Sequence, residues 1–489
     1  MTSSKDQPSN PPTGRPAAEP QKPAVPSPAA TTDAPPGDPP GDPPRRGVDA
    51  HSQGRPATAR RHVLQTLAAM GAGAALGTFL PEPRLAGATA GTGSLAPNGR
   101  DDTWALQQAL DHNATVTLPA GHFQVGSVRL NSGNRLTMAA NTVLHSIPPE
   151  RSDYRGVLLV QDVDDVVIEG GMIDGTGGPV MNGINIEGAH RLRVRDIRIV
   201  NMATTSDGVR GDGIYIRRGI AGKPLRHATD IVIEGVTADA NGRQGLSLVS
   251  GRQIHILHCT FSNTTSAVPG AGIDFEPNVD NDTIDDVVVT DCTFEGNETG
   301  VLVFMKNAER MASVTLRDCV FRGNRTNGIT GRLDGVDGLT VTGCTFDANQ
   351  RSALVLANAE SVAVLDNRIR NHPAGIGIEI ENVRAWQVRG NDVRGCGHSG
   401  VLVTNPGTFP STGTLSQNQV WNNGTSAAGT AGIHLRSETA PLRAIVRDNW
   451  CGNTEPDGPQ AQAITTRGAG VEAGDTEQLD RDNRQTNTH

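Results

Sequence analysis

Acidic and amide residues alternate along the segment GIDFEPNVDND, which begins at Gly272. They are Asp274, Glu276, Asn278, Asp280 and Asp282. Because alternate side chains of a β-strand share one face, a strand here would hold Asp274 and Glu276 outward together, with Cα atoms about 6.5 Å apart. Paired carboxylates at this spacing suit acid–base catalysis, as in inverting glycosidases, or calcium binding; they also occur on surfaces that only meet water.

Other strands that begin with Gly align with this segment and extend its outward face. Aligned by their first residue, GIYIRR, GLSLVS, GIDFEP, GVLVFM and GITGRL place two columns of side chains outward on one sheet. The first column contains Tyr215, Ser247, Asp274, Leu302 and Thr330, and the second contains Arg217, Val249, Glu276, Phe304 and Arg332. Further along, the two columns continue with Val355 and Ala357, Gly377 and Glu379, and Leu402 and Thr404, which we take to be chemically bland. The polar residues are therefore concentrated on the first coils.

Loops that enter and leave these strands add charged residues, and long loops on one side of a repeat fold commonly border its binding face. We select Asp274, Glu276 and Asp212 as candidate catalytic residues. The candidate substrate-binding residues are Tyr215, Arg217, Arg218, Arg243, Gln244, Arg210 and Lys306. We expect each carboxylate of the Asp274–Glu276 pair to raise the pKa of the other, and Arg217 to lower one of them.

A repeat of short strands must position these residues. The unit apolar-x-apolar-x-x-[C/N]-x-apolar recurs every 23 to 33 residues, as in IHILHCTF, VVVTDCTF and VAVLDNRI. Its marked positions are Cys259, Cys292, Cys319, Cys344, Asn367, Asn391, Asn418 and Asn449. Period-2 strands at this spacing, with no helical pattern between them, predict an all-β solenoid whose coils bury their inner faces by stacking.

The column of Cys and Asn falls where the chain is expected to bend between strands. Stacked Asn side chains can hydrogen-bond to one another and to the turn backbone, and Cys can occupy the same position as a small buried hydrophobe. Four of the six cysteines lie in this column. We therefore predict free structural thiols rather than disulfides or a zinc site.

A short helix and a strand are expected before the coils, in DDTWALQQALDHNATVTLPAGHF. Thr103 would cap a helix through Leu110 that covers the open end of the solenoid. With this opening and the repeats over residues 98 to 465, the chain resembles right-handed parallel β-helix proteins of the pectin-lyase-like superfamily. The opening segment itself is similar to that of the polygalacturonase-like members. The resemblance implies a single-stranded right-handed parallel β-helix.

The resemblance also implies that a polysaccharide lies along the parallel sheet and that hydrolases of this fold use Asp residues on consecutive coils. By position it implies Asp212 and Asp274 as catalytic residues. The paired Asp-Asp and the Gly-His-Gly of polygalacturonases are absent, and Arg243-Gln244 stands at that place. The calcium site of pectate lyases is not matched residue by residue, although DFEPNVDND could bind calcium. No cofactor is required by the hypotheses below, and calcium remains possible.

Composition separates the 489-residue chain into four segments. They are a Pro-rich disordered leader (1–57), a signal peptide (58–90), the β-helix catalytic domain (91–470) and a polar disordered tail (471–489). Arg60 and Arg61 precede an apolar run from Val63 to Leu80, which resembles a twin-arginine export signal. An uncleaved membrane anchor is the alternative. With export, the twin-arginine machinery is a partner, and no membrane is expected after signal cleavage.

These observations favour a secreted or periplasmic enzyme that degrades a polysaccharide. The net charge of −9 argues against a nucleic-acid partner, and nothing indicates the oligomeric state. The first hypothesis is a glycoside hydrolase with carboxylate acid and base. The alternatives are a polysaccharide lyase with Arg or Lys as base, and a non-enzymatic carbohydrate-binding solenoid. The arginine supply and an aromatic content of 3% favour an anionic sugar.

Overall fold

The computed structural model describes residues 92–151, 155–204, 210–219, 224–305, 310–426, 430–454, 459–460, 462–468, 471–472 and 484–487. The expected leader (1–57) and signal peptide (58–90) lie outside these residues. Within them, no helix is both long enough and apolar enough to cross a membrane.

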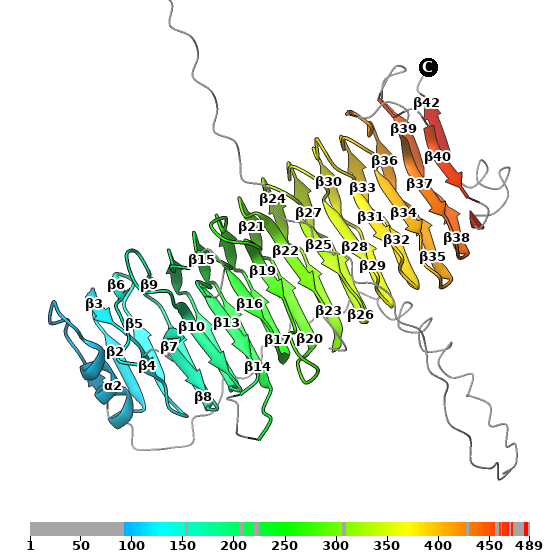
Figure 1. Ribbon diagram of the computed structural model, residues 1–489. Helices are drawn as coiled ribbons and strands as arrows, with labels where there is room; N and C mark the ends of the chain where they lie inside the picture. Colours follow the sequence, from blue (N-terminus) through cyan, green and yellow to red (C-terminus); the bar gives the residue numbers. More distant parts are fainter. Residues whose placement is uncertain are drawn as a thin grey trace, which may run out of the picture. The chain divides into compact units, whose positions relative to one another are not determined.

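The described chain is a solenoid of parallel strands, as predicted, with one strand of each coil in each of three sheets (Figure 1). Sheet A contains β1 (Thr92–Ser94), β2 (Thr115–Leu118), β5 (Arg135–Met138), β8 (Asp164–Glu169), β11 (His190–Arg195), β14 (Ala228–Glu234), β17 (Gly251–Leu257), β20 (Thr283–Thr290), β23 (Arg310–Arg317), β26 (Val336–Thr342), β29 (Ser361–Leu365), β32 (Ala385–Arg389), β35 (Ser411–Ser416), β38 (Leu442–Arg447) and β41 (Val471–Glu472). Sheet B contains β3 (Gly121–Val125), β6 (Thr142–Ser146), β9 (Met172–Asp174), β12 (Arg198–Val200), β15 (Thr237–Asp239), β18 (Thr260–Ser262), β21 (Thr293–Glu295), β24 (Val320–Arg322), β27 (Thr345–Asp347), β30 (Arg368–Arg370), β33 (Asp392–Arg394), β36 (Gln419–Trp421), β39 (Trp450–Asn453) and β42 (Arg484–Asn487). Sheet C contains β4 (Val128–Arg129), β7 (Gly156–Gln161), β10 (Asn182–Glu187), β13 (Ile214–Arg217), β16 (Leu246–Leu248), β19 (Ala271–Phe275), β22 (Thr299–Phe304), β25 (Ile329–Arg332), β28 (Leu354–Ala357), β31 (Ile378–Glu381), β34 (Val401–Asn405), β37 (Ala431–Ser437) and β40 (Gln462–Arg467).

Sharp bends connect sheet A to sheet B, and a left-handed residue makes each bend possible. The residue before each position of the Cys/Asn column has positive φ, for example Asp366 at 55° and Gly390 at 69°. Asp and Asn tolerate this conformation better than other residues with a side chain, and Gly adopts it freely. At Gly390 a Cβ would lie 2.0 Å from Asp366 Oδ1, so a larger residue there would require the Asp366 side chain to move.

The predicted Asn ladder follows these bends along the inside of the solenoid. Asn367 Nδ2 donates to Asn391 Oδ1 at 2.9 Å, and Asn391 donates to Asn418 in the same way. Cys344 lies below the ladder, and its backbone N–H donates to Asn367 Oδ1 at 2.8 Å. All six cysteines are buried and free, which confirms the prediction of structural thiols.

A second ladder, which we did not predict, lies after the strands of sheet B. Asn297 Nδ2 donates to Asn324 Oδ1 at 3.3 Å, and Asn324 Nδ2 donates to Asn349 Oδ1 at 2.7 Å. Cys396 lies further along this ladder, where its N–H donates to Asn423 Oδ1. The recurring segments EGNET, RGNRT and DANQR contain this signal.

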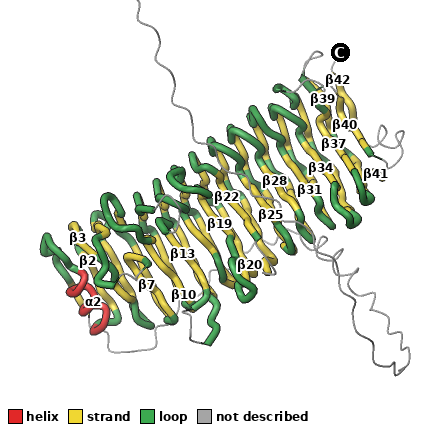
Figure 2. The backbone as a smooth tube through the Cα atoms, viewed as in Figure 1, coloured by secondary structure: helices red, strands yellow, loops and turns green. Residues whose placement is uncertain are grey.

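The helix α2 (Thr103–His112) covers the N-terminal coil with Leu106 and Leu110, as the sequence predicts (Figure 2). The predicted cap is wrong: Asp102 occupies the N-cap position, and Thr103 is the first helical residue. Thr103 Oγ1 instead accepts a hydrogen bond from Gly126 N at 2.8 Å, so it ties the helix to the next coil. At the other end, β41 and β42 lie within 471–489, so the parallel sheets continue into the expected tail.

Candidate active site

Strand pairing in sheet C brings the two polar columns together as predicted. Tyr215 on β13 is paired with Ser247 on β16, and Ser247 with Asp274 on β19. The next member of this row is Leu302 on β22. The candidate site therefore lies on neighbouring strands of one sheet, within the reach of single side chains.

The expected alignment is wrong by two residues at β31. Val355 is paired with Glu379, not with Gly377, so Glu379 and Glu381 face outward where a bland surface was expected. In GIGIEI the second Gly directly precedes the strand, and a Cβ at Gly377 would lie 2.5 Å from Gly400 O. Burial and the nearby Glu381 raise the pKa of Glu379.

Asp274 is buried, contrary to the prediction that it faces outward into solvent. All five residues of β19 are buried, and Asp274 is 1% exposed. The buried Gln244 donates from Nε2 to Asp274 Oδ2 at 2.8 Å, and Gln244 Oε1 accepts from Ala271 N at 2.7 Å. Asp274 therefore anchors the loop that contains Gln244.

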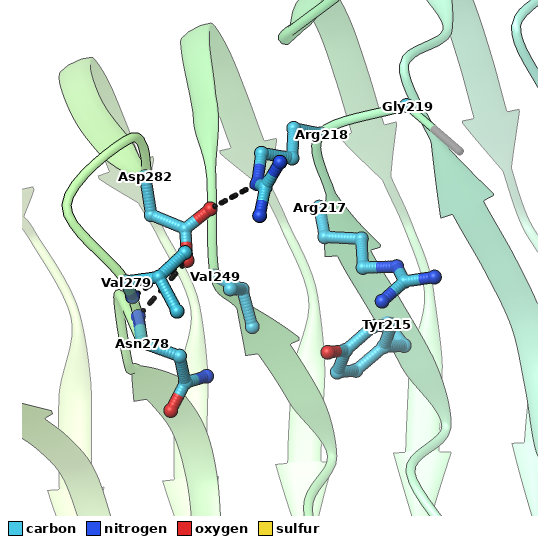
Figure 3. Close-up of a pocket in the computed structure, with 8 residues that line it drawn as sticks. All are labelled: Tyr215, Arg217, Arg218, Gly219, Val249, Asn278, Val279 and Asp282. Atoms are coloured by element: carbon cyan, nitrogen blue, oxygen red, sulfur yellow. Dashed lines mark hydrogen bonds and ion pairs between the residues drawn. The ribbon is translucent and has the colours of Figure 1, made fainter. Parts of the chain in front are cut away.

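Glu276 lies just beyond β19 with 15% of its side chain exposed, and the alternating pattern ends there. Asp282 Oδ2 accepts hydrogen bonds from the backbone nitrogens of Asn278 and Val279, and Asp282 Oδ1 accepts one from Arg218 Nε at 3.0 Å (Figure 3). Asp282 thus closes a turn and ties it to Arg218. In the described part of the chain, no group of three or more His, Cys, Asp or Glu side chains is placed to hold a metal ion.

Arg243 lies between a buried carboxylate and an accessible one. Its Nη1 is 3.2 Å from Asp212 Oδ2 and 3.2 Å from Ser247 Oγ, and its Nη2 is 2.8 Å from Glu276 Oε2. Burial works against the charge of Arg243, but Asp212 and Glu276 outweigh it and raise its pKa. Burial also raises the pKa of Asp212 to about 6, despite the opposing attraction of Arg243. Asp212 is 1% exposed, which explains why burial prevails.

Arg217 has a carboxylate partner other than the predicted one, and Arg218, selected as a substrate-binding residue, also has a carboxylate partner. Arg217 Nη2 is 2.7 Å from Glu187 Oε1, and Glu187 is 2% exposed. Arg217 is therefore paired with Glu187 on β10, a partner that was not predicted. Arg218 is paired with Asp282.

Two small cavities meet at Tyr215 and Asn278. The first, about 240 Å³, is lined by Arg155, Asn182, Arg210, Tyr215, Arg243, Glu276 and Asn278. The second, about 160 Å³, is lined by Tyr215, Arg217, Arg218, Gly219, Val249, Asn278, Val279 and Asp282 (Figure 3). We call the two together the arginine cleft. Burial raises the pKa of Tyr215, which keeps its hydroxyl protonated at neutral pH.

Arg155 and Arg210 differ from the other arginines of the cleft. Among the described residues, neither lies within ion-pair distance of a carboxylate, and Arg210 Nε is buried without a hydrogen-bond partner. Burial, and then repulsion from Arg155, lower the pKa of Arg210. Arg155 was not predicted, because it precedes the strand GVLLVQ, which comes before GIYIRR, the first strand of the alignment. The predicted Lys306 lies outside the described residues.

A family model described as "Right handed beta helix region" matches residues 121–284 and 278–450. The chain belongs to this family. The match also confirms the hand of the solenoid that the sequence resemblance implies. Comparison with curated proteins finds no match.

Solved structures share the fold at low sequence identity. The A-module of mannuronan C-5 epimerase AlgE4 from Azotobacter vinelandii has a TM-score of 0.51 and 15% identity, covering 78% of this chain and 98% of the module. The AlgE6 A-module from the same organism has a TM-score of 0.50 and 14% identity, covering 80% of this chain and 96% of the module. At these identities the likeness shows the fold alone.

Proposed function

We propose that this protein is an enzyme that binds an anionic polysaccharide in the arginine cleft and transforms it by proton transfer. The observation that carries the proposal is that Arg155 and Arg210 share one cavity with Glu276 and Tyr215, and have no acidic partner in the described chain. Two neighbouring guanidinium groups repel each other and are stabilised by an anion. A sugar carboxylate matches their planar, bidentate geometry.

The groups around the first cavity suit β-elimination from a uronate. Arg155 and Arg210 would neutralise the carboxylate, which makes the proton at C5 more acidic. Glu276 would accept that proton while the bond between C4 and the bridging oxygen breaks and a C4–C5 double bond forms. Tyr215, protonated at neutral pH, would donate its proton to the departing oxygen. The products are an unsaturated uronate and a new chain end.

Arg243 has a different part in this proposal from the base considered in the sequence analysis. Its raised pKa keeps it a cation, so it cannot accept the C5 proton. Paired with Asp212 and Glu276, it would orient the Glu276 carboxylate toward the cavity. On binding, its charge would also assist Arg155 and Arg210.

Hydrolysis is the second candidate, and the raised pKa of Asp212 favours it. A pKa of about 6 suits a general acid, and Glu276 would then activate water. Because Asp212 is 1% exposed, Arg243 would have to move toward the substrate before Asp212 could reach a glycosidic oxygen. Asp274 would support the loop of Gln244 in either reaction.

The two reactions are distinguished by incubating the protein with a panel of uronate-containing and neutral polysaccharides. β-Elimination produces ultraviolet absorbance from the unsaturated uronate together with new reducing ends. Hydrolysis produces reducing ends alone, and proton exchange without cleavage introduces deuterium at C5 in heavy water. Binding with none of these changes would identify a carbohydrate-binding solenoid and overturn the proposal of an enzyme.

A polymeric substrate of this kind also fits a secreted or periplasmic location, which we propose on the strength of the segment 58–90. N-terminal sequencing of exported protein tests it. Export that is unaffected by Arg60→Lys together with Arg61→Lys would contradict a twin-arginine signal.

A further inference from the structure

A second polar cavity lies on sheet C, well away from the arginine cleft. It has a volume of about 320 Å³ and lies where β31, β34 and β37 are side by side (Figure 1). Strand pairing places Tyr215 and Glu379 in one row, six strand spacings or about 29 Å apart. The polar residues that line the cavity are Glu379, Glu381, Thr404, Asn405, Arg436 and Glu438. We call this cavity the glutamate pocket.

Two carboxylates of the glutamate pocket have no cationic partner in the described chain. Glu379 and Glu381 both face outward from β31, and neither forms an ion pair there. The arginine of the pocket, Arg436, is instead paired with Glu438. Burial, and then the nearby Glu381, raise the pKa of Glu379, so its negative charge is unfavourable until a cation approaches. The glutamate pocket is therefore the electrostatic opposite of the arginine cleft and favours a positively charged ligand.

A buried amide gives the pocket an acceptor that has no partner. Asn405 is 0% exposed, and its Nδ2 donates to the carbonyl oxygens of Phe409, Ala440 and Pro441, each at 3.1 Å. These contacts fix which way the amide faces, because turning it over would place its oxygen against carbonyl oxygens. Asn405 Oδ1 has no hydrogen-bond partner among the described residues. Since a buried acceptor left unpaired costs free energy, a donor on a ligand in the pocket that Asn405 lines would be stabilised.

The glutamate pocket suits an organic cation better than a metal ion. Over the described ranges, no three acidic, His or Cys side chains converge as metal ligands. The volume of about 320 Å³ instead falls within the range of sites for small molecules, about 300–1,000 Å³. Leu402 and Pro406 add an apolar wall, and Thr404 adds a hydroxyl group. A protonated amino sugar matches this lining, because it has an ammonium group, hydroxyl donors and an apolar ring face.

We propose that the glutamate pocket binds a protonated amino sugar, with the ammonium group at Glu379 and Glu381 and a hydroxyl group donating to Asn405 Oδ1. This inference goes beyond the proposed function and does not rest on it, because the pocket shares no lining residue with the arginine cleft. A chain that contains amino sugars would bind here whether or not a uronate reacts in the cleft. The N-acetylated sugar has the same ring without the charge, so it should bind weakly.

Isothermal titration of the protein with a glucosamine tetramer and with its N-acetylated counterpart tests the proposal. The amine should bind, less tightly as salt is added, and the N-acetylated tetramer should bind at least about tenfold more weakly. Glu379→Gln and Glu381→Gln should each weaken binding of the amine about tenfold. Glu360→Gln is the matched control, because Glu360 is an exposed glutamate of the preceding coil that is paired with Arg384, and it should have no effect.

Thermal unfolding without sugar separates a binding role from a structural one. Because Gln removes an unpaired charge, Glu379→Gln and Glu381→Gln should leave Tm unchanged or raise it. A lowered Tm in both variants would show that the pair supports the fold and would overturn the inference. Equal binding of the two tetramers, equal weakening by Glu360→Gln, or binding of calcium alone would overturn it as well. Failure of all uronate chemistry in the arginine cleft would leave it intact.

Discussion

Arg243 Nη2 donates a hydrogen bond to Glu276 Oε2 at 2.8 Å, while Nη1 of the same guanidinium reaches the buried Asp212. Arg243 therefore holds the accessible Glu276 carboxylate in place, and the buried Asp212 carboxylate holds Arg243 in turn. Asp212, Arg243 and Glu276 flank three neighbouring strands of sheet C, and each of the three side chains has a different environment. That difference separates the expected effects of substituting them.

Asp274 and Glu276 should differ in their effect on stability. Asp274→Ala removes the buried acceptor of Gln244 Nε2 and should lower the free energy of unfolding by about 1–3 kcal/mol. Glu276→Gln keeps an oxygen that can accept from Arg243 Nη2 and should have a smaller effect, about 1 kcal/mol or less. Urea unfolding of both variants measures this. Equal, small effects would show that Asp274 is exposed as the sequence pattern suggests.

Asp212 should make the folded protein less stable as the pH rises. Its folded pKa is about 6, above the ordinary value of 3.8, so the folded state binds more protons than the unfolded state between these values. The free energy of unfolding should therefore fall by about 2 kcal/mol from pH 4 to pH 6 through this group, and by about 3 kcal/mol between pH 3 and pH 7. Asp212→Asn should lack this component. Parallel pH profiles for the variant and the unsubstituted protein would contradict the assignment.

Arg155 and Arg210 should determine the selectivity for anionic chains. Arg155→Gln and Arg210→Gln should each weaken the binding of an acidic polysaccharide about tenfold and reduce its salt dependence. Arg332→Gln is the control, because Arg332 lies exposed on the same sheet and is paired with Asp334. A similar loss in the control would mean that general surface charge, rather than the cleft, binds the polymer.

The cysteines should be inert in the folded protein. Burial raises the pKa of both Cys396 and Cys451 to about 12, which disfavours the reactive thiolate. A thiol reagent should label none of the six cysteines under native conditions and all six after unfolding without reductant. Fewer than six after unfolding would reveal a disulfide and contradict the structural role of the Cys/Asn column.

The repeat in the sequence was sufficient to predict the solenoid and the strand register over the first coils. Both follow from period-2 burial and from bends marked by a Cys or Asn after a left-handed residue. The alignment error at Gly377 arose because GIGIEI contains two Gly residues, Gly375 and Gly377, and the sequence alone does not show which of them precedes β31. A Cβ at either Gly would clash with a neighbouring coil, with Arg351 C at Gly375 and with Gly400 O at Gly377, so only the pairing of the stacked coils selects the register.

The candidate site was less predictable, because its chemistry depends on which outward side chains later become covered. Alternation places Asp274 on the outer face of sheet C. Gln244, from the loop before the neighbouring strand β16, packs over Asp274 and donates a hydrogen bond to it. The partners of Arg217 and Arg243 are 30 or more residues away in the sequence. Arg155 precedes the strands used in the alignment, and its place beside Arg210 depends on the stacking of coils. Contacts of this kind arise from the stacking of coils and leave no periodic signal.

Turnover by Glu276→Gln and Tyr215→Phe on the identified polysaccharide tests the central claim most directly. Both residues line the first cavity, and neither belongs to the core, so folding and affinity should be largely preserved. If they transfer the protons, each substitution should lower kcat by about 10²–10⁴-fold while binding stays within a few-fold. Unchanged kcat in both variants, with normal binding, would show that the arginine cleft is not the active site.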